Sequence, residues 1–159
     1  MIRYLIFLLI ILVVSSFCSC QKRTQSFIAS VIFDTSKAKQ ILDQCSRPSP
    51  KNISKIFKLE GAEVKILENN LAKLTTLDTS LNLSKYGVQY IGVVMNNKDY
   101  IYINAFPFEW SQNSQRDFPN WKVEPINMCD GGNHFFGVLF NIKQQEFSEL
   151  YFDGTKVSN

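Results

Sequence analysis

The sequence has few of the residues from which catalytic and metal sites are built. Its 159 residues include one histidine and four cysteines, and their spacing does not match a zinc site. A glycine-rich phosphate loop and the serine elbow of hydrolases are also missing. We therefore assign no catalytic residue, no metal ligand and no cofactor from the sequence.

Neither positive nor negative charge is present in large excess. The chain has 17 Lys and Arg against 14 Asp and Glu, a formal net charge of +3. Like charges are scattered and never run longer than the pair Lys22-Arg23. A chain this close to neutral is not expected to have nucleic acid as a partner.

The chain also lacks a linker rich in Pro, Gly or Ser, and it contains no repeat. Its length suits one domain of ordinary size. We expect a leader over residues 1–19, a tether and short strand over residues 20–33, and a single domain over residues 34–159.

The leader contains the one long apolar run. Arg3 precedes this run over Tyr4–Val14, and the polar part of the chain begins after Cys20. This order is typical of an export signal peptide. The ending Phe17-Cys18-Ser19-Cys20 resembles that of bacterial lipoproteins, in which the cysteine after the cleavage site carries acyl chains such as palmitate. We expect a lipid at Cys20 that binds the protein to the inner or outer membrane, facing the periplasm or the cell surface. An uncleaved anchor and a plain secretory signal are the alternatives.

Two further cysteines remain, Cys45 and Cys129. In an oxidising compartment such a pair suggests one disulfide between the first helix and the C-terminal sheet. The alternative is that both are small buried apolar residues.

Helical periodicity dominates the first half of the domain. Ala38, Ile41, Leu42 and Cys45 recur at helical spacing and predict a helix that begins after Asp34 or Thr35 and ends near Cys45. A second apolar stripe predicts a helix over residues 60–77.

The second half is predicted to be β. Tyr86–Met95 and Tyr100–Phe106 flank a turn of the kind that favours Asn, and residues 133–140 and 146–152 give a second hairpin. The sequence therefore predicts an α+β domain in which two N-terminal helices pack on an antiparallel sheet of four or five strands built from two hairpins. One face of that sheet is expected to be covered by the helices, and the other to be partly aromatic and open.

The densest polar cluster of the sequence is the segment from Met128 to His134. Cys129 and His134 lie close enough in sequence for a nucleophile pair. The simpler interpretation is a turn, in which Asp130 bonds to nearby amides and Gly131-Gly132 permit positive φ.

Aromatic residues provide the remaining signal. Exposed aromatic side chains on a rigid scaffold commonly anchor binding surfaces. The candidates are Tyr100, Tyr102, Trp110, Phe118 and Trp121. The alternative is that both tryptophans fold back and roof the open face of the sheet.

Several segments together resemble a group of small bacterial lipoproteins found in Bacteroidetes-type genomes, mainly over residues 86–154. These segments are Gln89-Tyr90-Ile91-Gly92-Val93, Tyr100-Ile101-Tyr102-Ile103-Asn104-Ala105-Phe106, Cys129-Asp130-Gly131-Gly132, Phe136-Gly137-Val138 and Leu150-Tyr151-Phe152-Asp153-Gly154. No activity is associated with the group, so the resemblance implies a location and no catalytic residue.

The sequence thus predicts a non-enzymatic, lipid-anchored envelope protein that binds another protein, in an inhibitor or immunity-like role. Two alternatives stay open. One is an enzyme that uses Cys129 with His134. The other is a carrier with a small-ligand pocket between helices and sheet.

Overall fold

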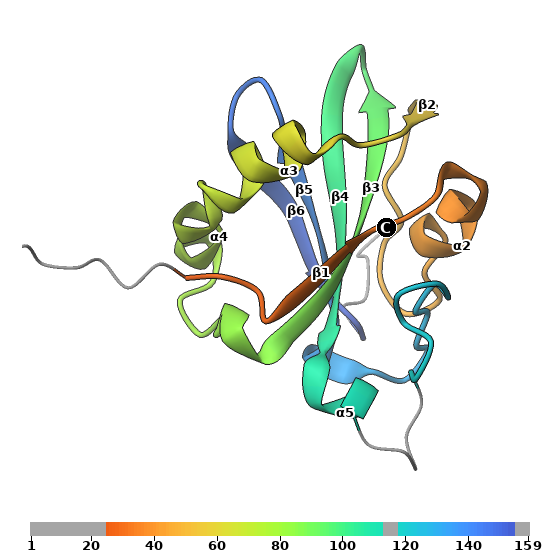
Figure 1. Ribbon diagram of the computed structural model, residues 1–159, viewed down its shortest axis with the longest axis vertical. Helices are drawn as coiled ribbons and strands as arrows, with labels where there is room; N and C mark the ends of the chain where they lie inside the picture. The colour runs from red at the N-terminus through yellow and green to blue at the C-terminus, as the bar shows by residue number, and fades with distance from the viewer. Residues whose placement is uncertain (1–24, 113–117, 155–159) are drawn as a thin grey trace, which may run out of the picture.

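A mixed sheet of six strands forms the centre of the computed structural model (Figure 1). The structure describes residues 25–112 and 118–154, so the leader and Cys20 lie outside the described residues. The strands are β1 (Ala29–Ile32), β2 (Ile53–Phe57), β3 (Tyr86–Met95), β4 (Lys98–Pro107), β5 (Phe136–Asn141) and β6 (Glu146–Phe152). Their order is β1-β3-β4-β5-β6, and β2 pairs with β3.

The α+β class and both predicted hairpins are confirmed. The predicted sheet was too small, however, and not all of it is antiparallel. β1 pairs in parallel with residues 87–90 of β3, and β2 pairs antiparallel with residues 92–95 of the same strand. Both strands lie on the outer edge of β3. β1 falls within residues 20–33, where a short strand is expected, but its pairing with β3 is not predicted. β2 is too short to show a clear period.

The β3–β4 hairpin follows from its turn residues. Asn96 and Asn97 have φ values of +50° and +59°, and Met95 pairs with Lys98 across them. A two-residue turn with positive φ at both positions matches the right-handed twist of the two strands, and Asn tolerates that conformation better than most residues.

The helices are shorter than predicted. They are η2 (Thr35–Lys37), α2 (Ala38–Leu42), α3 (Gly61–Glu68), α4 (Leu71–Leu77), η3 (Leu83–Lys85), α5 (Phe108–Gln112) and η4 (Gly132–His134). The predicted helix over residues 60–77 is divided into α3 and α4, because the side chain of Asn70 donates to the carbonyl of Ile66 (2.9 Å) where the helix would continue. In the part of the chain that the structure describes, no helix is long and apolar enough to span a bilayer.

Helices α3 and α4 cover one face of the sheet (Figure 1). Their apolar side chains pack against alternate residues of β3, β4 and β5 in one core. Its members include Val64, Leu67, Leu71, Leu74, Val88, Tyr90, Ile103 and Val138. The space between these helices and the sheet is therefore filled by side chains, where the carrier hypothesis expects a pocket.

The opposite face is covered as well, contrary to the expectation of an open aromatic face. Helix α2 packs there through Ile41 and Leu42 against Ile91 and Val93, and Figure 1 shows it across the sheet from α3 and α4. The rest of this face lies under residues 118–135, which we call the cap. The predicted helices thus pack on different faces of the sheet.

Candidate functional site

The predicted aromatic surface is divided between the interior and the exterior. Tyr102 is 2% exposed and Trp121 is 7% exposed, so both are core residues. Tyr100, Trp110 and Phe118 are half-buried. The structure therefore does not bring all five side chains to a common exposed surface.

Trp110 and Phe118 do belong to one cluster. Both meet the ring of Phe135 edge to face, with ring centroids 5.3 and 6.0 Å apart. Trp121 packs below them against Phe106 at 5.5 Å. Trp121 is thus a roof over the sheet, whereas Trp110 and Phe118 flank a buried ring and remain partly accessible.

A buried ion pair lies under the cap. The Nη1 of Arg47 donates to Oδ1 of Asp153 at 2.5 Å, and the two side chains are 1% and 0% exposed. The guanidinium also donates to Tyr102 Oη (3.2 Å) and to Asn104 Oδ1. A Cβ at Gly137 would lie 2.8 Å from Arg47 Nε, so a glycine there leaves room for the guanidinium. Burial raises the pKa of Tyr102, although the adjacent Arg47 charge opposes the rise.

Asn104 and Gln89 extend this network to the backbone of the cap. Asn104 Nδ2 donates to Gln89 Oε1 (3.0 Å) and to the carbonyl of Ile126 (2.8 Å). Gln89 Nε2 donates to the carbonyls of Trp121 (2.7 Å) and Glu124 (2.8 Å). Polar side chains of two central strands therefore satisfy cap carbonyls that would otherwise be buried without partners.

A disulfide between Cys45 and Cys129 fastens the edge of the cap, with Cα atoms 5.1 Å apart. Hydrogen bonds flank it: Asn127 Nδ2 donates to the carbonyl of Asp43 (2.8 Å), and Ser46 Oγ donates to that of Met128 (2.8 Å). Since the sulfur of Cys129 is bonded to Cys45, this form of the protein holds no Cys129 thiolate for the enzyme hypothesis.

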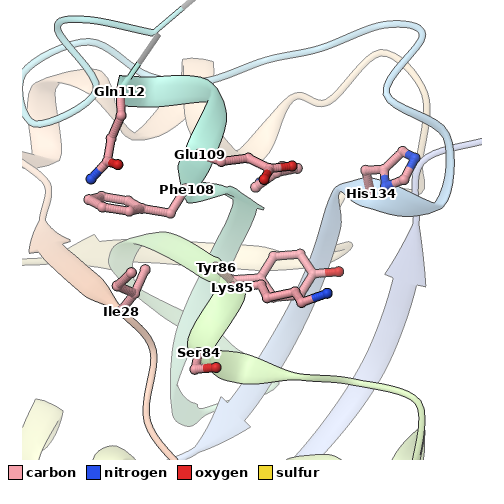
Figure 2. Close-up of a pocket in the computed structure, with 9 residues that line it drawn as sticks. Ile28, Ser84, Lys85, Tyr86, Phe108, Glu109, Gln112 and His134 are labelled. Atoms are coloured by element: carbon pink, nitrogen blue, oxygen red, sulfur yellow. The ribbon is translucent and has the colours of Figure 1, made fainter.

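His134 lies on the other side of the cap, in η4, and is exposed. Its ring centroid is 6.1 Å from that of Trp110. His134 also lines a groove of about 400 Å³ at the end of the sheet where β3 begins and β4 ends (Figure 2). The groove is formed by Ile28, Ser84, Lys85, Tyr86, Pro107, Phe108, Glu109, Gln112 and His134.

The groove has two chemically different sides. Figure 2 shows Ile28 and Phe108 on one side, and the Lys85 amine and Tyr86 hydroxyl pointing toward the side where His134 lies. Burial raises the pKa of Tyr86, and the negative charge of Asp78 adds to the rise, so this hydroxyl stays protonated and can donate.

Sequence reasoning did not identify Arg47, Asp153 or the groove. Arg47 follows the end of the predicted helix and precedes Pro48, and its partner Asp153 lies 106 residues away. The available signal was Gln89 and Asn104, two amides within otherwise apolar strands, because a buried amide requires partners.

Among the residues that the structure describes, no group of His, Cys, Asp and Glu is arranged to hold a metal ion. No protein-family model, curated protein or solved structure matches the chain. The resemblance to bacterial lipoproteins therefore stays a prediction.

Proposed function

We propose that the chain is an exported, lipid-anchored envelope protein that binds another protein and catalyses no reaction. An inhibitor or immunity-like role suits a small domain held at a membrane. The Cys45–Cys129 disulfide supports the location, because such bonds persist in oxidising compartments outside the cytoplasm.

The observation that carries the binding proposal is the partly exposed pair Trp110 and Phe118 against Phe135. Trp and other aromatic residues supply much of the binding energy at protein interfaces. Phe118 belongs to the cap, which is fastened by the disulfide and by the Gln89–Asn104 network. A surface fixed before binding loses little conformational entropy when a partner docks.

Affinity capture with the tagged full chain from envelope and secreted extracts of the source organism tests this function. We expect one stoichiometric protein partner, which then binds the purified chain in a two-component titration. Trp110→Ala and Phe118→Ala should each weaken that titration by at least about tenfold, as expected for interface anchors.

Leu77→Ala is the matched control, since Leu77 is an exposed apolar residue on α4. It should leave the affinity unchanged. Thermal melts of all three variants separate lost binding from lost folding. A partner whose affinity is the same for all three variants contradicts this surface, and a capture without any partner contradicts the binding function.

The location has its own test, the intact mass of the protein isolated from membranes. We expect a chain that begins at Cys20, carries acyl groups and is two hydrogen masses lighter for the Cys45–Cys129 bridge. A chain that still carries the leader indicates an uncleaved anchor, and one without acyl groups indicates plain secretion. Either result overturns the lipid anchor.

A further inference from the structure

The groove lies where the N-terminal segment joins the fold. The amide of Ile28 donates to the carbonyl of Tyr86 (3.0 Å), and the side chain of Ile28, 53% exposed, lines the groove. Ile28 lies eight positions after Cys20 in the chain. A chain of that length spans at most about 28 Å when fully extended. A lipid at Cys20 would therefore keep the groove close to the bilayer.

The charges in the groove are open to a ligand. Among the residues that the structure describes, the ion pairs are Lys39–Asp43 and Arg47–Asp153, and neither Lys85 nor Glu109 is paired with another described residue. The groove thus offers a cation, an anion and the hydroxyl of Tyr86 beside the apolar surface of Phe108. Its volume of about 400 Å³ falls in the range of small-molecule sites.

This combination fits one class of molecule that is abundant at a membrane surface. A zwitterionic phospholipid presents a phosphate, an ammonium group a few bonds away, and methylene groups directly below. Lys85 Nζ and the Tyr86 hydroxyl can donate to the phosphate. The Glu109 carboxylate can accept from the ammonium, and Ile28 and Phe108 can contact the apolar portion.

We propose that this groove binds the zwitterionic headgroup of a phospholipid of the phosphoethanolamine type, in the membrane that carries the anchor. The inference rests on the proposed lipid anchor for the source of the ligand. Headgroup binding at this end orients the domain, so that the groove faces the bilayer.

The test uses a soluble probe, glycerophosphoethanolamine, titrated against the full chain purified in detergent and followed by NMR. We expect binding with a Kd of about 1 mM. Lys85→Gln and Glu109→Gln should each weaken it by about tenfold. Lys98→Gln and Glu146→Gln are the matched controls, since both residues are exposed and lie at the other end of the sheet. They should leave the Kd unchanged.

A second probe, glycerophosphoglycerol, has the phosphate without the ammonium. It should bind more weakly than the first probe and be insensitive to Glu109→Gln. The proposal is overturned if neither probe binds up to about 10 mM, or if the groove variants bind as tightly as the controls. Binding of free leucine in place of both probes, lost in the groove variants, also overturns it and indicates an amino-acid site.

The same preparation separates this inference from the proposed function. The probes are soluble, so their binding does not require an acylated chain. An acylated Cys20 with no probe binding overturns the groove site alone. Probe binding by a chain that carries no acyl group overturns the lipid anchor, and with it the membrane as the source of the ligand.

Discussion

At the scale of single residues, Arg47 joins three buried side chains, those of Tyr102, Asn104 and Asp153. Its charge is removed from water and is balanced by Asp153. Loss of one partner of such a pair leaves an uncompensated buried charge, which costs about 3–5 kcal/mol. We therefore expect Arg47→Met to lower the free energy of unfolding by that amount, as measured by urea denaturation.

The control for this prediction is Lys39→Met, which breaks the ion pair with Asp43. Those side chains are 87% and 70% exposed, and exposed pairs of this kind contribute about 0.5 kcal/mol or less. A double variant, Arg47→Met with Asp153→Leu, should recover part of the loss because no charge is left buried. Equal losses for Arg47→Met and Lys39→Met would contradict the buried pair.

Tyr90 is a second residue whose burial has a measurable consequence. Burial raises its pKa above the ordinary tyrosine value, and the negative charge of Glu68 adds to the rise. Above about pH 10 the unfolded chain loses the Tyr90 proton, whereas the folded chain keeps it. The contribution of Tyr90 to the free energy of unfolding is therefore fully present below about pH 10 and is lost as the pH rises. We expect Tyr90→Phe to make the alkaline loss of stability shallower by up to about 1.4 kcal/mol per pH unit. Urea titrations between about pH 9 and pH 11 measure both slopes, and equal slopes would contradict the prediction.

At the scale of secondary-structure elements, the β3–β4 turn links a local backbone conformation to the central hairpin. Asn97 has φ of +59°, which costs most side-chain-bearing residues about 1–2 kcal/mol and costs Gly nothing. Asn97→Ala should therefore destabilise the domain by about 1 kcal/mol, whereas Asn97→Gly should be neutral or stabilising. Asn133→Ala is the control, since Asn133 is exposed and lies outside the positive-φ region. Thermal and urea denaturation measure the differences, and equal stability of the Ala and Gly variants would refute this role of the turn.

The elements that could be predicted from the sequence are those with a long periodic pattern or a characteristic turn. The central hairpin was predictable because its strands are long and β-rich, and because Asn96-Asn97 favours the turn. β2 has 5 residues, too few to show a period that separates it from a loop. β1 lies within residues 20–33, where a short strand is expected, but its 4 residues do not indicate the parallel pairing with β3. At the end of α3 the backbone amide of Asn70 donates to the carbonyl of Leu67, and its side chain donates to that of Ile66. These bonds compete with the helix and leave the apolar stripe intact.

The candidate sites were less predictable than the elements because their members come from distant parts of the chain. Trp110 and Phe118 are close in sequence, and both meet the ring of Phe135, which the sequence does not indicate. The burial of Trp121 depends on Phe106, a contact that no local pattern encodes. The groove combines residues 28, 84–86, 107–109, 112 and 134, and only the completed sheet brings these segments together.

At the scale of the whole molecule, the cap is held both at its centre and at its edge. Gln89 and Asn104 bind its centre from within, and the disulfide holds its edge to the segment that follows α2. The disulfide closes a loop with a sequence separation of 84 residues. The chain-entropy model gives a stabilisation of about 4.5 kcal/mol for a loop of that length.

This arrangement predicts a protein that loses stability on reduction but keeps its fold. Cys45→Ser with Cys129→Ser should lower the free energy of unfolding by about 4 kcal/mol or somewhat less. The amides of the cap should then exchange hydrogen faster than those of β3 and β4, because the inner hydrogen bonds remain and the edge is released. Wild-type protein treated with a dithiol should show the same pattern, since both sulfur-bearing residues are exposed. Uniformly faster exchange throughout the sheet would show that the disulfide supports the whole domain, and unchanged exchange in the cap would show that the inner network alone holds it.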